Sequence, residues 1–251
     1  MTQAQNPIIV IPARMASTRL PRKPLADIAG EPMIVHVWRR GMEADCGPVV
    51  VACAEEEIAA VIRSVGGEAV LTDPEHPSGS DRIQEALESF DPKKKYDPVI
   101  NLQGDLPTIE RTLLQAVLRP FDDNSFEIAT LVARISRPEE RIDPNVVKAV
   151  VSLPPGKDIG PAIYFSRANV PWSADNNGQL YHHIGLYAYR REGLRRFVAF
   201  GPDALEKRER LEQLRALVHG MRIGAACVDT LPLGVDTPAD LELARKILSP
   251  Y

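Results

Sequence analysis

The chain has 251 residues, of which 44% are hydrophobic and 25% are charged, which excludes a disordered segment and a disulfide-stabilised mini-protein. Its 30 lysines and arginines against 34 aspartates and glutamates leave a net charge of −4, without the basic excess of a nucleic-acid-binding protein. Three cysteines form no CxxC pair, no apolar run approaches the ~20 residues of a membrane span, and the initial MTQAQNP lacks the cations of a signal peptide. We therefore expect a cytoplasmic protein with reduced thiols and no membrane partner.

Strands and helices alternate regularly in the first half of the chain. The apolar runs at residues 7–13 and 48–53 are rich in valine and isoleucine and too short for helices, which is typical of buried parallel strands. Apolar periodicity and capping signals predict further elements, which are a helix at 31–44, a helix at 55–65, a strand at 68–71, a helix at 80–90, a strand at 98–102 and a helix at 109–118. This alternation predicts a parallel, doubly wound sheet that binds ligands at the carboxyl ends of its strands.

From about residue 126 the pattern changes to strand-like segments joined by proline-rich connections. The predicted elements are strands at 128–135, 146–153, 181–190 and 222–229, a helix between 190 and 200, a helix at 205–218 and a closing helix at 237–248. No linker of the Gly/Ser type separates the two halves. We therefore expect one α/β domain over residues 1–251, in which a central mixed, mainly parallel sheet carries an antiparallel extension.

The first predicted strand runs into a basic loop, RMASTRLPRKP, at residues 14–24. Arg14, Arg19 and Lys23 could neutralise phosphate charge, while the hydroxyls of Ser17 and Thr18 and the backbone amides approach phosphate oxygens. The loop has neither a GxxxxGK[ST] nor a GxGxxG pattern, so it is not a Walker loop or a dinucleotide fingerprint. A solvated basic loop without a ligand is the alternative, and the charge pattern alone does not separate the two.

Two aspartates follow predicted strands. Asp105 ends the sequence NLQGD after the strand at 98–102, and Asp236 lies in GVDTP after the last strand. Carboxylates at such strand ends could share Mg²⁺, which prefers oxygen ligands and completes its octahedron with water and substrate phosphates. For Asp236 the motif alone favours a different role, the N-cap of the closing helix.

Several sequence motifs in a fixed order carry a resemblance to a known family. They are IPARMASTRLPRKPL at 11–25, GEPMIVHVWRR at 30–40, HPSGSDR at 76–82, NLQGDLP at 101–107, DPNVVKAV at 143–150, IYFSRANVPW at 163–172, HHIGLYAYR at 182–190, LEQLR at 211–215 and GVDTPADLE at 234–242. With these motifs, which span nearly the whole chain, the sequence resembles the 3-deoxy-manno-octulosonate cytidylyltransferases, also called CMP-Kdo synthetases.

The resemblance implies a three-layer nucleotidyltransferase fold that works as a homodimer. It implies a Mg²⁺-dependent reaction in which CTP and 3-deoxy-manno-octulosonate (Kdo) give CMP-Kdo and pyrophosphate, by direct displacement without a covalent enzyme intermediate. It further implies a nucleotide-binding half at 1–125 and a sugar-binding and dimerisation half at 126–251.

The resemblance also assigns roles to individual residues. The cations on the triphosphate side are Arg14, Arg19 and Lys23, and the magnesium ligands are Asp105 and Asp236. The nucleotide wall includes Ser78, Gly79 and Arg82, and the sugar contacts are Gln103, His183, Tyr187, Glu212 and Gln213.

The residues alone leave simpler interpretations open for the sugar side. A lone histidine in a strand, such as His183, is more often structural than catalytic. Tyr187 lies four residues further on, and the strand period of two places both side chains on one face, which favours a shared pocket. Glu212 and Gln213 flank the apolar face of the helix expected at 205–218, and without the resemblance they would be solvated surface residues.

The chain departs from the family pattern at three places, and alternatives remain. Leu106 stands where many members have an acid after NxQGD, Ser80 replaces the common threonine of SGT, and Ala52-Cys53-Ala54 stands where Thr-Asp is frequent. A CMP-sialic acid synthetase is the nearest alternative enzyme, although HHIGLYAYR and LEQLR favour Kdo. A nucleotide-sugar-binding module without turnover is the non-enzymatic alternative, and both metal carboxylates argue against it. The missing GxGxxG pattern argues against an NAD-dependent oxidoreductase.

Overall fold

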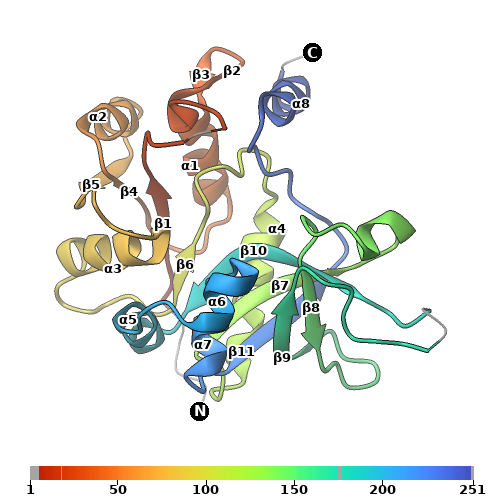
Figure 1. The fold of residues 1–251 in the computed structure, drawn as a ribbon. Coiled ribbons are helices and arrows are strands. Elements are labelled where there is room, and N and C mark those ends of the chain that lie inside the picture. The colour runs from red at the N-terminus through yellow and green to blue at the C-terminus, as the bar shows by residue number, and fades with distance from the viewer. Residues whose placement is uncertain (1–5, 18, 175–176, 250–251) are drawn as a thin grey trace. The chain divides into compact units, whose positions relative to one another are not determined.

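The computed structural model describes residues 6–17, 19–174 and 177–249 (Figure 1). Its contacts divide the chain into two compact units. The first unit contains the described residues up to Gln115 together with those from Pro232 onward, and the second unit is Ala116–Leu231. The segment that carries Asp236 therefore belongs to the same unit as the basic loop. The assignment of nucleotide binding to 1–125 and of sugar binding to 126–251 stays a prediction.

Four parallel strands form the sheet of the first unit. In spatial order they are β5 (Glu68–Leu71), β4 (Val49–Cys53), β1 (Ile8–Ala13) and β6 (Val99–Asn101). Within β1, Ile9 pairs with Val49 of β4 on one side and with Ile100 of β6 on the other. Because β1, β4 and β6 are buried on both faces, their sequences are continuous apolar runs.

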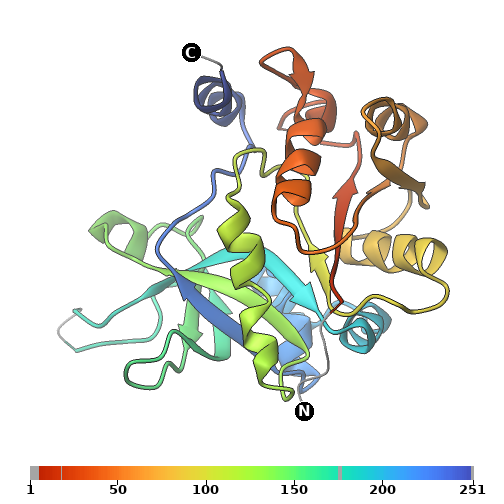
Figure 2. The ribbon, with the colours of Figure 1, turned by 180° about the vertical axis from the view of Figure 1, so that it is seen from behind.

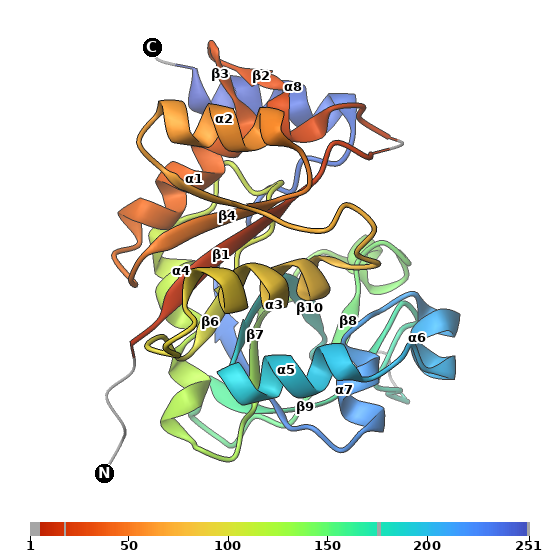
Figure 3. The same cartoon turned by 90° about the vertical axis from the view of Figure 1, so that its left-hand side faces the viewer.

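Helices cover both faces of this sheet. They are α1 (Met33–Glu43), α2 (Glu56–Ser64) and α3 (Gly79–Phe90), and the shorter α4 (Arg111–Ala116) leads toward the second unit. Figure 3 shows α1 and α2 on one face of β1 and β4, and α3 on the other. From β1 the chain adds β4 and then β5 in one direction, and it then returns to place β6 on the opposite side of β1. Because crossovers between parallel strands are right-handed, this reversal of direction places α3 on the face opposite to α1 and α2. The predicted doubly wound arrangement is confirmed, and its switch point lies between β1 and β6.

The last helix packs on a small hairpin that follows the basic loop. A 3₁₀ turn at Lys23–Leu25 leads into β2 (Asp27–Ile28) and β3 (Glu31–Pro32), and α8 (Pro238–Leu248) lies beside this hairpin (Figures 1 and 2). Their shared core consists of Ile28, Met33, Val235, Leu241 and Ala244. Since Val235 belongs to that core, the packing also fixes the position of its neighbour in sequence, Asp236.

Five strands form the sheet of the second unit. In spatial order they are β10 (Tyr181–Tyr189), β7 (Ile128–Arg134), β11 (Ile223–Val228), β9 (Ile159–Ser166) and β8 (Lys148–Val151). The start of β10 also pairs with β8, so these strands curl back on themselves. The β7–β11 pair is parallel and the other pairs are antiparallel. The expected antiparallel extension is therefore present, but it contains one parallel pair.

The helices of the second unit are short. They are α5 (Arg191–Ala199), α6 (Ala204–Glu209) and α7 (Leu214–Val218), together with 3₁₀ turns at Arg119–Asp122 and Pro138–Arg141. The prediction of one helix over 205–218 is wrong, because Arg210 adopts a left-handed conformation with φ 55° and ends α6. Over the described ranges, none of the helices has both the length and the apolar character needed to cross a membrane.

Candidate functional site

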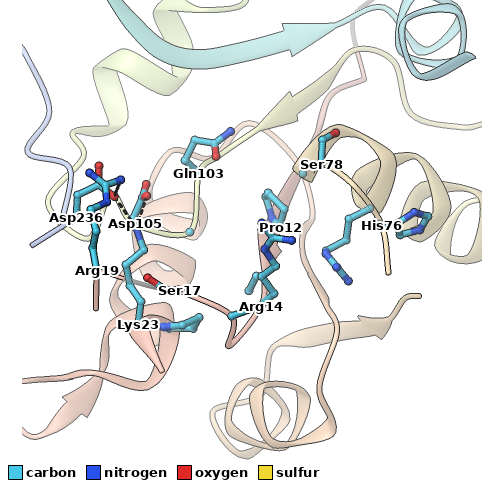
Figure 4. Close-up of a pocket in the computed structure, with 16 residues that line it drawn as sticks. Pro12, Arg14, Ser17, Arg19, Lys23, His76, Ser78, Gln103, Asp105 and Asp236 are labelled. Atoms are coloured by element: carbon cyan, nitrogen blue, oxygen red, sulfur yellow. Dashed lines mark hydrogen bonds and ion pairs between the residues drawn. The ribbon is translucent and has the colours of Figure 1, made fainter. Parts of the chain in front are cut away.

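A pocket of about 430 Å³ lies at the carboxyl ends of β1 and β6 in the first unit (Figure 4). Its walls come from the loop after β1, the start of α3, the loop after β6 and the segment before α8. Every predicted site residue of the first unit lines it, and these are Arg14, Arg19, Lys23, Ser78, Gly79, Arg82, Gln103, Asp105 and Asp236. The pocket occupies the switch point at which an open α/β sheet binds its ligands.

The ammonium group of Lys23 joins the two predicted metal carboxylates. Its Nζ lies 2.7 Å from Asp105 Oδ2 and 3.0 Å from Asp236 Oδ1, and it donates to the Val235 carbonyl at 3.1 Å. Arg19 Nη2 lies 3.0 Å from the same Asp236 oxygen (Figure 4). Burial by itself would lower the pKa of Lys23, but the attraction of Asp105 and Asp236 outweighs burial and raises that pKa. Lys23 therefore keeps its positive charge and holds three oxygens around one point.

The N-cap of α8 is Thr237, the residue after Asp236. Its Oγ1 accepts a hydrogen bond from the Asp240 amide at 3.2 Å, and the Asp240 carboxylate accepts from the Thr237 amide at 2.8 Å, which forms a capping box. The side chain of Asp236 faces Lys23 and Arg19 instead of the helix. The simpler interpretation of Asp236 as the N-cap is therefore wrong, and its carboxylate lines the pocket.

The chain around Asp105 needs a glycine to bring β6 close to β1. A Cβ atom on Gly104 would lie 2.8 Å from the carbonyl oxygen of Pro12, which is closer than side-chain carbons approach. The carbonyl of Asp105 accepts a hydrogen bond of 2.9 Å from the Val235 amide. Gln103 lies at the pocket wall, where its Nε2 donates to Asn101 Oδ1 at 2.9 Å. These contacts explain how the NLQGD motif places Asp105 beside Asp236.

The HPSGSDR motif forms the start of α3. Ser78 is the N-cap of this helix, and its Oγ accepts hydrogen bonds from the amides of Ser80 at 3.2 Å and Asp81 at 3.4 Å. Within the motif, Ser78 and Gly79 line the pocket near Pro12 of β1. The Ser78 hydroxyl thus has a structural role in addition to its predicted place in the nucleotide wall.

Arg82 is a buried cation without a carboxylate hydrogen bond among those that the structure records. Its Nη1 donates to Thr72 Oγ1, and its Nη2 is buried with no hydrogen-bond partner among the described residues. Burial lowers the pKa of Arg82, and nearby Arg14 acts in the same direction. A buried donor of this kind at a pocket wall is suited to a hydrogen-bond acceptor on a ligand.

Sequence reasoning missed two residues beside the pocket. Glu55, at the start of α2, accepts a hydrogen bond of 3.0 Å from the Met15 amide and so fastens the basic loop. His76 lines the pocket, and its Nε2 contacts the Glu85 carboxylate. Pairing of His76 with Glu85 depends on helix geometry in α3, whereas the Glu55 contact spans 40 positions of sequence and has no local signal. Thr18, whose hydroxyl was considered for phosphate binding, lies outside the described residues.

In the second unit, His183 and Tyr187 share one face of β10, as the strand period predicts. Their ring centroids are 5.4 Å apart, and His183 also makes an edge contact with Phe165 of β9 at 4.8 Å. Burial lowers the pKa of His183 to about 3 and raises the pKa of Tyr187 well above its usual value. Thr130 Oγ1 lies 3.1 Å from His183 Nε2. Both rings therefore carry no charge near neutral pH.

Glu212 and Gln213 do not lie in a continuous helix but in the turn between α6 and α7. Gln213 is 6% exposed, and its Nε2 has no hydrogen-bond partner among the described residues. Glu212 Oε1 lies 3.6 Å from Arg215 Nη2. The simpler interpretation of both residues as solvated surface, which the sequence gives without the family resemblance, is wrong for Gln213, because its side chain is buried.

The chain matches known cytidylyltransferases over most of its length. The model of the cytidylyltransferase family matches residues 8–223. A 3-deoxy-manno-octulosonate cytidylyltransferase of Paramagnetospirillum magneticum is 60% identical, with 97% of this chain and 98% of its own covered. One of Rhodospirillum centenum is 62% identical, with coverage of 100% and 96%. The chain belongs to the 3-deoxy-manno-octulosonate cytidylyltransferase family.

Solved structures agree with this family and with the predicted fold. The structure of a CMP:2-keto-3-deoxy-manno-octonic acid synthetase complexed with CTP is 38% identical, covers 97% of this chain and 98% of its own, and matches with a TM-score of 0.86. A cytidylyltransferase from Leptospira borgpetersenii, 14% identical and with a TM-score of 0.61, shows the fold alone. The three-layer nucleotidyltransferase fold that the family resemblance implied is confirmed.

The first unit has a donor set that fits the Mg²⁺ ion implied by that resemblance. Asp105 Oδ2, Asp236 Oδ1 and the Val235 carbonyl all surround the Lys23 ammonium, so three hard oxygen donors already converge on a cation. The site has only two carboxylates, and the described residues contain no larger group of three or more His, Cys, Asp or Glu side chains that could hold a metal. A magnesium site with two carboxylates and remaining positions for water and phosphate oxygens matches what that ion prefers.

Proposed function

We propose that the protein transfers CMP from CTP to Kdo and releases pyrophosphate, so that it activates Kdo for lipopolysaccharide synthesis. The observation that carries the proposal is the pocket at the switch point, where Arg14, Arg19 and Lys23 of one loop stand with Asp105 and Asp236. Cations for a triphosphate and a pair of carboxylates for its metal ion are the groups that nucleotidyl transfer needs. The curated relatives at about 60% identity carry the name of this activity.

Cytosine selectivity is supported by Arg82. Directed at atom N3 of the base, its buried Nη2 donor would select cytosine, whose N3 accepts a hydrogen bond, over uracil, whose N3 carries a proton, whereas O2 accepts in both bases. A site that leaves a buried donor or acceptor unpaired rejects the wrong base strongly. We therefore place the base of CTP against Arg82 and its phosphates along the basic loop.

The reaction in this proposal is a single in-line displacement. The anomeric hydroxyl of Kdo gives up its proton to water, its oxygen bonds to the α-phosphorus of CTP, the bond from that phosphorus to the bridging oxygen breaks, and pyrophosphate leaves. Arg14 and Arg19 neutralise the leaving phosphates. Cys53 of β4 pairs with Ala13, which lines the pocket. Burial raises the pKa of its thiol to about 11, so Cys53 is a poor nucleophile, and the displacement requires no covalent intermediate.

The two pocket carboxylates are the proposed holders of Mg²⁺. A magnesium ion held by Asp105 and Asp236 would supply positive charge to the phosphates and would favour ionisation of the attacking hydroxyl. Lys23 then contributes its fixed charge from the same cluster, and Gln103 at the neighbouring wall orients the sugar. The family resemblance also assigns His183, Tyr187, Glu212 and Gln213 to the sugar, where the uncharged His183 and Tyr187 suit hydroxyl groups.

We also propose a homodimer that works in the cytoplasm. The second unit exposes large apolar side chains, with Trp172 84%, Ile142 76% and Ile163 57% exposed. Exposed large apolar side chains of this kind favour a protein contact, and symmetric pairing is the commonest one. Both substrates are small molecules, and neither a nucleic acid nor a membrane takes part in the reaction.

Pyrophosphate release tests the proposed function. The purified protein is assayed with CTP or UTP, with Kdo or sialic acid, and with Mg²⁺ or EDTA. The proposal predicts release only with CTP, Kdo and Mg²⁺ together. Release with sialic acid but not Kdo would establish the CMP-sialic acid synthetase alternative, comparable rates with UTP would contradict the role of Arg82, and full activity in EDTA would contradict the metal site.

A further inference from the structure

We propose that Glu209 is a positioning residue of the sugar site, because its carboxylate fastens the turn at residues 210–213 to the end of β9. The proposal rests on the proposed function, from which Glu212 and Gln213 in that turn take their role in binding Kdo. Glu209 itself contacts protein groups, so it acts on the sugar through the turn.

Glu209 contacts Ser166, the last residue of β9, and Arg167, which follows it. Ser166 Oγ donates to Glu209 Oε1 at 2.8 Å, and the Arg167 amide donates to Oε2 at 3.0 Å. In addition, Arg167 Nε donates to the backbone carbonyl of Glu209 at 2.8 Å, while its Nη1 reaches the Pro144 carbonyl at 2.8 Å. Both carboxylate oxygens of Glu209 thus accept hydrogen bonds from the end of β9. Hydrogen bonds to a charged acceptor are stronger than those to a neutral one.

The turn at 210–213 begins directly after this clamp. Glu209 is the last residue of α6, and Arg210 has the left-handed conformation that reverses the chain. On the far side, the Arg215 guanidinium binds the Glu206 carboxylate through Nε at 2.9 Å and Nη2 at 2.8 Å, which ties α7 back to α6. The turn is therefore held at one end by Glu209 and at the other by the pair of Arg215 and Glu206.

A buried and unsatisfied amide lies inside this clamped turn. Gln213 is 94% buried, since its exposed fraction is 6%, and its Nε2 finds no acceptor among the described residues. An unpaired buried donor is costly, so it persists where surrounding contacts fix the backbone and where a ligand supplies the acceptor. Loss of the Glu209 clamp should let this turn relax and move Gln213 away from the position that binds the sugar.

The test compares Glu209→Ala, Glu209→Gln and Ser166→Ala in the full-length protein. We expect Glu209→Ala to raise the KM for Kdo ~10-fold while the KM for CTP stays within ~2-fold of wild type. Glu209→Gln should recover most of the loss, because its amide oxygen can accept from the Arg167 amide while its amide nitrogen donates to Ser166 Oγ. Ser166→Ala removes one of the contacts to the Glu209 carboxylate, together with the hydrogen bond that Ser166 Oγ accepts from the Ala168 amide, and should fall between wild type and Glu209→Ala.

Glu192→Ala is the matched control, because Glu192 is an exposed carboxylate of α5 in the same unit that pairs with Arg195. It should leave both KM values unchanged. If Glu209→Ala does not fold, Glu209→Gln and Ser166→Ala still decide the question. Equal increases in the two KM values, or an unchanged KM for Kdo in every folded variant, would overturn the proposal. Absence of turnover in the wild-type protein would instead overturn the proposed function, and with it this inference.

Discussion

Lys23 connects the two carboxylates of the pocket. It lies 82 positions from Asp105 and 213 from Asp236 in sequence, yet its ammonium contacts both carboxylates. The sequence predicts that each aspartate follows a strand, but not that one lysine joins them, because that depends on the packing of α8 on the hairpin after the basic loop. The same cluster explains why a cation of any kind is stable at this point.

Replacement of either carboxylate should abolish catalysis without unfolding the protein. We expect Asp105→Asn and Asp236→Asn each to lower kcat/KM by ~1000-fold or more, since loss of a metal ligand removes several kcal/mol of transition-state stabilisation. Glu242→Gln, an exposed carboxylate of α8 paired with Arg245, is the control and should keep full activity. Steady-state kinetics together with thermal unfolding check this prediction. Turnover near the wild-type rate in either aspartate variant would contradict the metal assignment.

Replacement of Lys23 should change metal binding and catalysis in opposite directions. In Lys23→Met the two carboxylates lose their internal counter-charge, so the nucleotide-free protein should bind Mn²⁺ ~10-fold more tightly than wild type. Use of CTP should nevertheless weaken, because a cation of the phosphate pocket is missing. Arg63→Met, on an exposed part of α2, should change neither quantity.

Titration calorimetry with Mn²⁺ and kinetics with CTP measure the two effects separately. Unchanged Mn²⁺ affinity in Lys23→Met would show that the positive charge of Lys23 does not oppose binding of the ion by the two carboxylates.

At the scale of elements, the sequence predicts the alternating first unit within one or two residues at most ends. Apolar runs and helical periodicity are local sequence signals, and the strands and helices of the first unit follow them. The second unit is less predictable. Strand β9 contains Gly160 and Pro161 and exposes Ile163, so its apolar alternation is broken. The break between α6 and α7 depends on a left-handed Arg210, a conformation for which glycine would have been the signal.

The packing of β10 against β9 sets a pH dependence on stability. Burial lowers the pKa of His183 to about 3 in the folded protein, against an ordinary value of 6.5. Between these values the unfolded chain binds a proton that the native state does not, so stability falls as pH decreases from 6.5, by up to ~1.4 kcal/mol per pH unit from this group. Above pH 6.5 the contribution is complete and flat.

Urea unfolding of His183→Gln between pH 5 and pH 8 measures this contribution. The variant should show a shallower decline of the free energy of unfolding below pH 6.5 than wild type. Identical slopes in wild type and His183→Gln would mean that the buried ring is protonated in the native state.

At the scale of the whole molecule, one chain forms two compact units. The first unit contains the pocket, and it also contains α8, although this helix comes from the far end of the sequence. The second unit carries His183, Tyr187 and the clamped turn, and it exposes Trp172. The change of element type near residue 126 does not predict that the described residues from Pro232 onward belong to the first unit.

The exposed apolar residues of the second unit predict the oligomeric state. Light scattering at micromolar concentration should give twice the mass of one chain, because exposure of Trp172, Ile142 and Ile163 to water is costly without a partner surface. Trp172→Asp should give the mass of one chain with an unchanged circular dichroism spectrum. A single-chain mass for wild type at every concentration would reject the dimer.

The central claim is that this protein moves an intact CMP group from CTP to Kdo. Phosphorus NMR of one reaction mixture with Mg²⁺ tests it most directly, because each phosphorus atom is followed at once. The account predicts that the three CTP signals are replaced by one phosphodiester signal and by pyrophosphate, in equal molar amounts and at a rate that depends on Kdo. Formation of CDP and inorganic phosphate, or a spectrum that Kdo does not change, would contradict it.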